Sequence, residues 1–554
     1  MSARRRVVIV GASAAGLRCA SRLARLEPET EVTVVEERRL FSVAACGLPY
    51  VLSGDLDGVD ALRRTVDGTL RDEAYFGDVK GVTVLAGWRA TSVDASGRRL
   101  ALEKSGERTS LEWDELVLAT GASARGLPGQ PRHPRVVGFH EAADLAPLHR
   151  GLVAGTIKHA AIVGAGLVGC ELCEAFRSLW GAEVTLIEAA PAPLPGLLDE
   201  EFGKVVASVL AEQGVRVLCG HTVERIEASD DGVTIMAGRE TVAADVAIVA
   251  IGVAPGVELG LKAGAALGPH GALAVDDRLG TSVPHVWAAG DCVETTCAVT
   301  GRPVYLPLGS LANRQGRTLA NILAGIDDRF PPVAGAMAVK VFDWNVAAVG
   351  VTRAVSLNLG REAKSVWVTG HDRAHYWPEA REIHLHLVYE VGKGTVLGVQ
   401  ALGMGDVVKR VDVATQWLLR GATLAELGHI EHAYAPPYAP AVDPLAVAAW
   451  AARNQERGVK AESPDVEFGE RGLLDVRNAD ESEDRPIPGG EPVLLPLDRL
   501  AAGAPPADSE WLVVCERGGR SAEGVWRLLR QGRSSTYLGG GLHLRRFVVP
   551  EKKR

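Results

Sequence analysis

The feature that most constrains the fold of this 554-residue chain is a glycine-rich unit of strand, turn, helix and strand. Apolar residues 7–10 predict a strand, residues 11–16 a turn that opens a helix, and residues 31–35 a second strand ending in Glu36. Glycines at such a turn let the backbone approach a pyrophosphate, and the acid accepts a ribose hydroxyl. This order predicts a dinucleotide-binding unit, in which Ser13 takes the place of the middle glycine.

The unit occurs a second time about 150 residues further along the chain. Residues 160–163 predict a strand, residues 164–169 form a complete glycine fingerprint, and the strand 183–187 ends in Glu188. The spacing from the first glycine to the acid is near the expected ~20 residues in both copies. Two copies predict an α/β protein with two Rossmann-like domains and two bound dinucleotides.

Three further apolar strands run into glycine turns. They end at Thr120-Gly121, at Gly252 and at Gly290-Asp291, and the last of these places a carboxylate directly after a strand. At the carboxyl ends of such strands, backbone turns and a single acid are typical of a ligand-binding edge.

Composition excludes several classes of function. The net charge of -9 argues against nucleic acid or an anionic membrane as the main partner. Eight scattered cysteines favour a reducing cytoplasm, where a special cysteine is catalytic or redox-active. No apolar run approaches the ~18 residues that span a bilayer. The N-terminus imitates a signal peptide, but Arg18 ends its apolar stretch early, so we expect a cytoplasmic protein.

The paired glycine units, the Ala-Thr-Gly turn and Gly290-Asp291 resemble the flavoprotein pyridine nucleotide-disulfide reductases over residues 5–450. The resemblance implies FAD in the first unit and a nicotinamide nucleotide in the second. The FAD contacts that it implies are Gly11, Ser13, Gly16, Glu36 and Asp291, and the nicotinamide-nucleotide contacts are Gly164, Gly166, Gly169 and Glu188. Further cofactor-binding candidates are Ala90, Thr120, Gly121, Glu171, Gly252 and Gly290.

Glu188 also predicts which nicotinamide nucleotide is used. A carboxylate at the end of this strand favours a free 2′-hydroxyl and repels a 2′-phosphate. Ala189 and Ala190 follow and supply no cation. We therefore expect NADH rather than NADPH.

Cys46 predicts the subfamily. It lies in residues 42–50, which resemble the signature of members with a single redox cysteine, and positions 41 and 51 hold no second cysteine. Cys46 must therefore react with a sulfur or oxygen atom supplied by another molecule. NADH peroxidases and oxidases usually carry a histidine where this chain has Ala14, so the resemblance favours the coenzyme A-disulfide reductases.

A coenzyme A site needs cations, and the first helix supplies them on one face at i, i+4 and i+7. The coenzyme A contacts implied by the resemblance are Arg18, Arg22, Arg25, Ser42 and, more weakly, Asn313. A solvated basic face is an equally good interpretation of the three arginines. Ala45 and Val442 depart from the residues common in that subfamily.

Two tyrosines extend the resemblance. Tyr434 lies in the segment 432–438 and Tyr376 in the segment 371–378, both similar to coenzyme A-disulfide reductases. In that family these tyrosines reach the cysteine of the other subunit, which implies a homodimer. A phenol beside a thiolate can donate a proton to a leaving thiol.

The C-terminal residues resemble a rhodanese domain in segments 473–477, 487–489 and 511–521. Cys515 follows an apolar strand and opens a glycine-containing loop that includes Arg520. Successive backbone N–H groups in such a loop form an anion nest that can hold a persulfide. Arg485-Pro486 stands where Gly-His is usual, so an inactive relic stays an alternative.

These observations predict an order of domains along the chain. We expect an FAD-binding domain (1–153 and 281–330), an NADH-binding domain (154–280), an α+β dimerisation domain (331–457), a linker (458–466) and a rhodanese-like α/β domain (467–554). Cys170 and Cys173 form a CxxC within a helix, without a second pair, and are expected to be core residues rather than metal ligands. We expect no metal site.

The expected activity is reduction of a coenzyme A disulfide, persulfide or polysulfide by NADH through FAD and Cys46, with sulfane sulfur carried on Cys515. One alternative is an NADH oxidase or peroxidase in which Cys46 cycles through a sulfenic acid. The other is a non-catalytic redox sensor, which would bind both dinucleotides without turnover.

Overall fold

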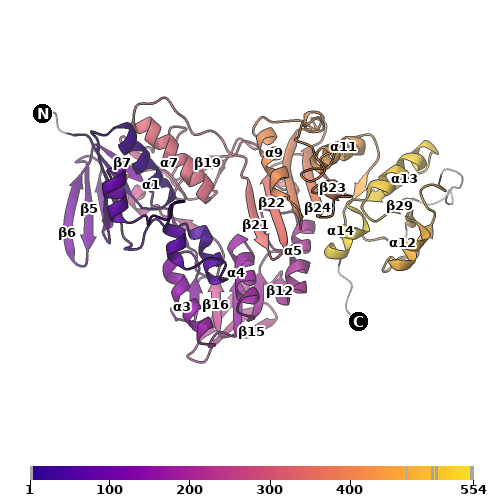
Figure 1. Cartoon of the computed structure of the whole chain (residues 1–554), viewed down its shortest axis with the longest axis horizontal. Helices are drawn as coiled ribbons and strands as arrows, with labels where there is room; N and C mark the ends of the chain where they lie inside the picture. The colour runs from indigo at the N-terminus through magenta and orange to yellow at the C-terminus, as the bar shows by residue number, and fades with distance from the viewer. Residues whose placement is uncertain (1–3, 470, 501–504, 506–509, 550–554) are drawn as a thin grey trace. The chain divides into compact units, whose positions relative to one another are not determined.

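The computed structural model describes residues 4–469, 471–500, 505 and 510–549 (Figure 1). The chain divides into two compact units. The first comprises residues 1–164, 172–186 and 223–333, and the second comprises residues 165–171, 187–222 and 334–554. Helix α4 (Leu167–Ser178) and strand β11 (Glu183–Glu188) have residues in both.

A five-stranded parallel sheet organises the first unit, as the glycine pattern predicts. Its strands, in spatial order, are β18 (Val286–Ala288), β7 (Glu115–Leu118), β1 (Arg6–Val10), β2 (Glu31–Glu36) and β3 (Thr83–Ala86). Helix α1 (Ala14–Leu26) connects β1 to β2. All of β1 beyond its first residue is buried, because helices and loops cover both faces of a parallel sheet.

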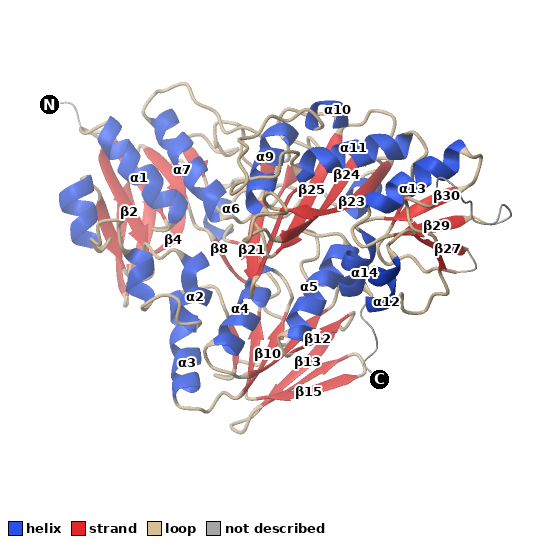
Figure 2. Cartoon of the chain, turned by 45° about the vertical axis from the view of Figure 1, so that its right-hand side comes forward, coloured by secondary structure: helices blue, strands red, loops and turns tan. Residues whose placement is uncertain are grey.

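Helix α7 (Gly309–Leu323) packs against α1, and the two lie side by side in Figures 1 and 2. The contact requires a glycine: a Cβ on Gly316 would lie 2.3 Å from the carbonyl oxygen of Ala15. Gly11 is constrained in the same way, because its φ is +110° and a Cβ there would lie 2.1 Å from the carbonyl oxygen of Ala119. These positions place the first glycine turn against the end of β7.

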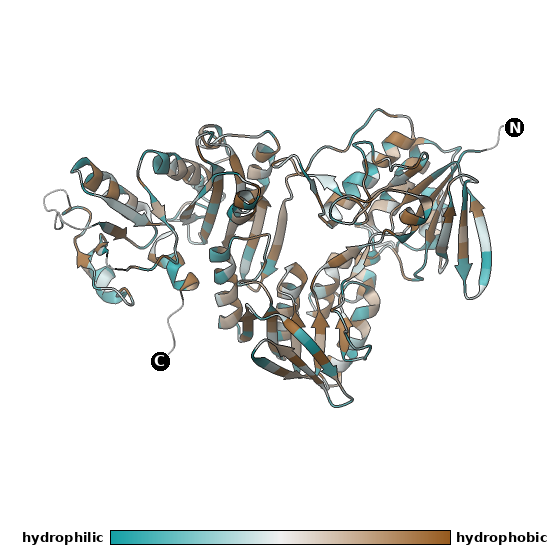
Figure 3. Cartoon of the chain, turned by 180° about the vertical axis from the view of Figure 1, so that it is seen from behind, coloured by the Kyte–Doolittle hydropathy of each residue, from teal (hydrophilic) through white to brown (hydrophobic). Residues whose placement is uncertain are grey.

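The other elements of the first unit form smaller sheets and single helices. Two groups of three strands are antiparallel: β4 (Arg89–Asp94), β5 (Arg99–Lys104) and β6 (Glu107–Glu112), and β13 (Val223–Ala228), β14 (Val233–Ala237) and β15 (Glu240–Ala244). Strands β9 (Val136–Gly138), β16 (Val246–Val249) and β10 (His159–Val163) pair in parallel. Two antiparallel pairs complete the unit: β8 (Ala122–Ala124) with β17 (Val253–Pro255), and β19 (Thr295–Thr296) with β20 (Pro303–Val304). The helices are α2 (Leu48–Leu52), α3 (Ala142–Val153) and α6 (Glu258–Ala263). Brown, hydrophobic residues concentrate in the strands of Figure 3, whereas the β5–β6 hairpin, whose strand β6 is mostly exposed, carries teal segments.

The second unit contains an antiparallel sheet with helices packed on it. Its strands, in spatial order, are β21 (Met337–Val341), β22 (Trp344–Gly350), β25 (Val396–Gly403), β24 (Glu382–Glu390) and β23 (Ala363–His371). The helices are α5 (Glu200–Glu212), α8 (Arg353–Asn358), α9 (Val408–Leu418), α10 (Leu424–Leu427) and α11 (Pro444–Glu456), with β12 (Val215–Cys219) after α5. Strand β25 is buried along its whole length, so this sheet is covered on both faces.

The C-terminal residues form a second sheet in this unit, which is parallel. Its strands, in spatial order, are β26 (Ala461–Glu462), β30 (Ser535–Leu538), β29 (Trp511–Val514), β27 (Gly472–Asp475) and β28 (Val493–Leu494). The helices are α12 (Ala479–Asp484), α13 (Gly519–Arg530) and α14 (Gly541–Val548). The segment 458–466, predicted as a linker, includes β26, which pairs with β30.

Helix α14 joins the two sheets of the second unit. It packs on α5, and the Ser208 hydroxyl donates a 2.5 Å hydrogen bond to the Phe547 carbonyl (Figure 2). The amide of Gly540, just before α14, donates to the Trp367 carbonyl at 3.1 Å. The C-terminal sheet is therefore fixed to β23 and α5 through these contacts.

Within the described residues, no helix is long and apolar enough to cross a membrane. In the same part of the chain, no three His, Cys, Asp or Glu side chains gather in a way that could hold a metal ion.

Candidate active site

The first glycine turn is fixed by the acid at the end of β2. Glu36 is 5% exposed and accepts hydrogen bonds from the amides of Ala12 (2.8 Å) and Arg38 (3.0 Å). Arg38 in turn pairs with Glu141, with Nε 2.9 Å from Oε2. Ser13 caps α1 and its side chain makes no capping hydrogen bond. The turn thus presents backbone N–H groups and a buried carboxylate side by side.

The second glycine turn repeats this geometry around Glu188. The amide of Ala165 donates to one carboxylate oxygen at 2.7 Å, and the amide of Ala190 to the other at 2.8 Å. A Cβ placed on Gly166 would meet no atom within 4 Å. The space beside this turn is therefore open to a ligand, and the predicted acid holds the same position as Glu36.

The Gly290-Asp291 turn makes hydrogen bonds with two other segments of the first unit, at Gln315 and at Tyr305. The Gly290 amide donates to Oε1 of buried Gln315 at 2.7 Å, and the Tyr305 hydroxyl donates to the Asp291 carbonyl at 2.9 Å. Burial raises the pKa of the Asp291 carboxyl above its ordinary value, with nearby His140 opposing the shift. A partly buried carboxylate at a strand end can accept a hydrogen bond from a dinucleotide.

The remaining cofactor candidates lie near these turns or in the core. Gly256 donates from its amide to the Gly121 carbonyl at 2.9 Å, next to Thr120. Gly252 has a φ of +96° and open space where a Cβ would stand. Ala90 lies on β4, where it packs against the core rather than facing open space. The residues present therefore fit one dinucleotide at each glycine turn.

Cys46 is exposed and lies in a one-turn 3-10 helix, Ala45–Gly47, directly before α2. A Cβ on Gly309, the first residue of α7, would lie 3.8 Å from the Cys46 sulfur. The N-terminus of a 15-residue helix therefore adjoins this sulfur. The partial positive charge of a helix N-terminus stabilises a thiolate, which is the reactive form of cysteine.

Ser42 connects the Cys46 loop to the first glycine turn. Its amide donates to the Ala12 carbonyl at 3.0 Å, and its φ of +59° is unusual for a residue with a side chain. Ser42 is 6% exposed, so its side chain lies within the loop rather than on the surface. The Cys46 loop and the predicted FAD turn are thus connected by a backbone hydrogen bond.

Two arginines that sequence reasoning missed tether the same loop. Buried Arg63 donates from Nε to the Phe41 carbonyl at 3.0 Å. Arg71 donates to the carbonyls of Ser42 (3.2 Å) and Leu62 (2.8 Å). Neither arginine belongs to a motif, so no local pattern could have singled them out.

The predicted coenzyme A contacts lie on α1 and α7. Arg18 and Arg25 are exposed, whereas Arg22 is partly buried and donates from Nε to Asn321 Oδ1 at 2.6 Å. Asn313 donates from Nδ2 to the Gly309 carbonyl at 2.8 Å, which places its side chain over the turn nearest Cys46. Four of the five predicted contacts are therefore placed around one helix pair, and Ser42 lies in the adjoining loop.

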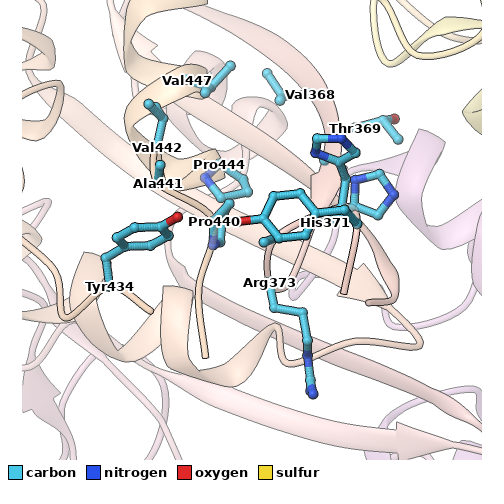
Figure 4. Close-up of a pocket in the computed structure, with 14 residues that line it drawn as sticks. Val368, Thr369, His371, Arg373, Tyr434, Pro440, Ala441, Val442, Pro444 and Val447 are labelled. Atoms are coloured by element: carbon cyan, nitrogen blue, oxygen red, sulfur yellow. The ribbon is translucent and has the colours of Figure 1, made fainter. Parts of the chain in front are cut away.

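In the second unit, the two predicted tyrosines meet at a cavity of about 300 Å³ (Figure 4). Tyr376 and Tyr434 share a hydrogen bond, which raises the pKa of Tyr376. Both rings are at least half exposed. The cavity is also lined by Val368, Thr369, Gly370, His371, Arg373, Ala374, His375, Pro440, Ala441, Val442, Pro444 and Val447. A ligand in this cavity would meet two phenol hydroxyls, and the other lining side chains are mostly apolar or basic.

Cys515 lies at the carboxyl end of β29 and is 1% exposed. Its sulfur accepts hydrogen bonds from the amides of Gly518 (3.2 Å) and Ser521 (3.3 Å). Arg520 makes two 2.6 Å hydrogen bonds to Glu481, which lower the pKa of Glu481 to about 2. The loop thus forms the predicted nest around the sulfur, and Arg520 is held beside it by a carboxylate.

Two carboxylates hold the flanks of the Cys515 loop. Glu516 pairs with Arg485 (2.9 Å) and Arg546 (2.8 Å) within the C-terminal sheet region. Glu382 of β24 pairs with Arg517 and with His543, the latter at 2.8 Å. The loop is therefore tied to the antiparallel sheet as well as to its own domain.

Comparison with protein families identifies the class of protein. A model described as pyridine nucleotide-disulphide oxidoreductase matches residues 5–316, and a model of the dimerisation domain of the same family matches residues 336–446. The chain therefore belongs to the pyridine nucleotide-disulphide oxidoreductases, a family that depends on FAD and NAD(P)H.

Particular relatives narrow the comparison. The NAD(P)H sulfur oxidoreductase (CoA-dependent) of Pyrococcus abyssi is 33% identical over 451 residues, which cover 80% of this chain and 97% of the relative. The solved NAD-dependent persulfide reductase from A. fulgidus is similar at a TM-score of 0.93 and 36% identity, covering 97% of this chain and 99% of that one. Reduced Bacillus anthracis CoADR-RHD is similar at a TM-score of 0.90 and 28% identity, covering 99% of each.

Proposed function

We propose that the protein is a cytoplasmic, homodimeric NADH-dependent reductase of coenzyme A disulfide, persulfide or polysulfide, with Cys46 as its single redox cysteine. The observation that carries this proposal is the position of Cys46. Its sulfur is exposed, it adjoins the N-terminus of α7, and its loop supplies no second cysteine. The sulfur that reacts with Cys46 must then come from a small molecule.

The two nucleotide turns support one cofactor each. The turn at Gly11 and Glu36 would hold FAD, and the turn at Gly166 and Glu188 would hold NADH. When bound, FAD accepts a hydride from the nicotinamide and makes an electron pair available to a disulfide. Because Ala189 and Ala190 follow Glu188 and supply no cation, the Glu188 carboxylate would disfavour the 2′-phosphate of NADPH.

The sulfur chemistry follows from the Cys46 thiolate. It attacks the inner sulfur of a persulfide R–S–SH, forms the mixed disulfide Cys46–S–S–R and releases HS⁻. Two electrons from NADH then cleave that disulfide to the Cys46 thiolate and R–S⁻, which takes up a proton. The overall reaction, R–SSH + NADH + H⁺ giving R–SH + H₂S + NAD⁺, is balanced. A coenzyme A disulfide reacts in the same way, with a thiolate as the first leaving group.

The tyrosine pair would supply the proton in this scheme. The phenols of Tyr376 and Tyr434 are hydrogen-bonded to each other at a cavity, and a phenol beside a leaving thiolate can protonate it. In a homodimer of this family, we propose that they act at the Cys46 of the other subunit. Names of similar proteins that include coenzyme A, persulfide and sulfur support this substrate class.

We further propose that residues 467–554 are a rhodanese domain that carries sulfane sulfur on Cys515. The nest of Gly518 and Ser521 amides around the sulfur supports an anionic Cys515 persulfide. The two solved structures reported above extend over nearly the whole chain, including this region. A persulfide formed there is a source of substrate for Cys46.

Steady-state consumption of NADH tests the proposed function. The wild-type protein should oxidise NADH with coenzyme A persulfide or coenzyme A disulfide, and the Cys46→Ser variant should lose this activity by at least 10³-fold (an order-of-magnitude expectation). Cys219→Ser is the matched control, because burial beside Glu188 raises the pKa of that thiol to about 11 and leaves it unreactive. Rapid turnover with oxygen or peroxide, and none with sulfur substrates, would instead establish an oxidase or peroxidase. Binding of both dinucleotides without turnover of any acceptor would establish a sensor.

A further inference from the structure

Helix α7 connects the redox cysteine to the arginines of α1. Gly309, at its N-terminus, adjoins the Cys46 sulfur. Asn313, Arg317 and Asn321 follow at successive intervals of four residues, which places them on one ridge of the helix. Asn321, at the far end of this ridge, accepts a 2.6 Å hydrogen bond from Nε of Arg22.

The packing of α1 on α7 brings Arg317 toward the α1 arginines. The helices touch where Gly316 meets the backbone of Ala15 and again where Asn321 meets Arg22. Arg317 lies next to the first contact and one turn before the second, so its side chain belongs to the same helix–helix groove as Arg22. Arg18 lies one turn before Arg22 on α1.

Most arginines around this groove make no ion pair in the part of the chain that the structure describes. Within the described residues, Arg18, Arg25 and Arg317 make no ion pair, although the chain as a whole is acidic. Burial and then the charges of Arg317 and Arg25 lower the pKa of Arg22, while Asp328 opposes the shift and Arg18 adds a smaller lowering. The nearby carboxylate of Asp328 accepts a hydrogen bond from Asn321 at 2.7 Å. Like charges held together without partners are typical of an anion-binding surface.

The length of α7 sets the distance between this surface and Cys46. Eight residues separate Gly309 from Arg317, which at 1.5 Å per residue is about 12 Å along the helix axis. A thiol bound at Cys46 can reach the groove only if its anionic groups lie on an arm of about that length. Thiols such as cysteine and glutathione carry their charges much closer to the sulfur.

We propose that Arg317 is a specificity-determining residue, which together with Arg18 and Arg22 binds the terminal phosphates of a thiol whose arm runs along α7. This inference rests on the proposed function for the reaction at Cys46. It adds Arg317 of α7 to the arginines of α1. The separation between the sulfur and the phosphates of the thiol is then what determines which thiols bind. Thiols with phosphates on a long arm are accepted, and short thiols are not retained.

The test compares two persulfides that share the same arm. Coenzyme A persulfide carries phosphates, whereas pantetheine persulfide lacks them. In the full-length protein, Arg317→Gln should raise the KM for coenzyme A persulfide by about 10- to 100-fold, as expected for loss of a charge-assisted phosphate contact. The kcat for this substrate and the KM for pantetheine persulfide should stay unchanged, which a merely structural defect would not produce.

Arg314→Gln is the matched control. It removes one positive charge from the same exposed side of α7, but its guanidinium stacks over Phe330 at 5.3 Å. This variant should leave the KM for coenzyme A persulfide within about twofold of wild type. An equal rise in Arg314→Gln, an equal rise with both persulfides, or no rise in Arg317→Gln would overturn the assignment.

Calorimetric binding of coenzyme A to the Cys46→Ser variant separates this inference from the proposed function. Adding Arg317→Gln should weaken that binding by the same factor, without any turnover. If the wild type consumed no NADH with either persulfide while this weakening was observed, the reductase function would fail and the phosphate site would stand. Unchanged coenzyme A binding would overturn the site whatever the turnover.

Discussion

Glu382 holds the Cys515 loop against the antiparallel sheet, and its removal has a calculable consequence. It pairs with Arg517 and His543, and these cations lower its pKa from 4.5 to about 2 despite partial burial. At about 1.4 kcal/mol per pH unit, that difference corresponds to about 3 kcal/mol of stabilisation. Because 21% of the side chain is exposed and glutamine keeps some hydrogen bonding, we expect Glu382→Gln to cost about 2 kcal/mol.

The sign of the pH dependence differs for the two partners. The pKa of Glu382 is lowered, so its contribution is complete above about pH 4.5 and is lost as the pH falls toward 2. Burial lowers the pKa of His543, but hydrogen bonds to Glu382 and Glu516 outweigh it, and the net shift is upward. Its contribution is therefore complete below pH 6.5 and is lost as the pH rises through the raised value. The contact is strongest between about pH 4.5 and 6.5.

Hydrogen exchange of the α14 amides measures this contact directly, because local opening reports the free energy of docking. Glu382→Gln should speed exchange in α14 by about 30-fold at pH 6, and by less once the pH exceeds the raised pKa of His543. Glu379→Gln, which removes an exposed partner of Arg373, is the control and should leave α14 unchanged. Unchanged exchange in Glu382→Gln, or an effect independent of pH, would refute the reasoning.

Three other changes have defined outcomes. Gly316→Ala places a Cβ 2.3 Å from the Ala15 carbonyl oxygen and should therefore separate α1 from α7. The variant should have a lower melting temperature and retain less FAD on purification. A melting curve identical to that of the wild type would contradict this packing. Glu188→Ser should raise the KM for NADH about tenfold and lower the ratio of kcat/KM for NADH to kcat/KM for NADPH. An unchanged ratio would show that Glu188 does not select the cofactor. Cys515→Ser should abolish sulfur transfer from thiosulfate while leaving NADH-dependent reduction of coenzyme A disulfide intact, and loss of both activities would contradict a separate role for Cys515.

The nucleotide turns and the local surroundings of Cys46 and Cys515 were predictable because local sequence determines them. A glycine turn followed by an acid requires only a short stretch of chain, and the hydrogen bonds of Glu36 and Glu188 to their turns follow from that spacing. Cys515 was found for the same reason, since its nest is built from residues within six positions of it. The parallel sheet around β1 is confirmed as predicted.

Contacts that depend on packing between distant segments were not predictable. Arg71 supports Ser42 across 29 positions, and Arg517 meets Glu382 across 135. Arg317 follows a predicted contact, Asn313, by one turn, yet only the packing of α7 on α1 relates it to Arg22. A single sequence contains no periodicity that reports which distant helix or strand a charged side chain will face.

The central claim is that Cys46 forms a mixed disulfide with coenzyme A. Its most direct test is the intact mass of the protein after incubation with coenzyme A disulfide, without reductant, for the wild type and the Cys46→Ser variant. We predict one adduct of coenzyme A mass on the wild type, its release by NADH, and no adduct on the variant. An unmodified wild-type protein, or an adduct that persists in Cys46→Ser, would contradict the account.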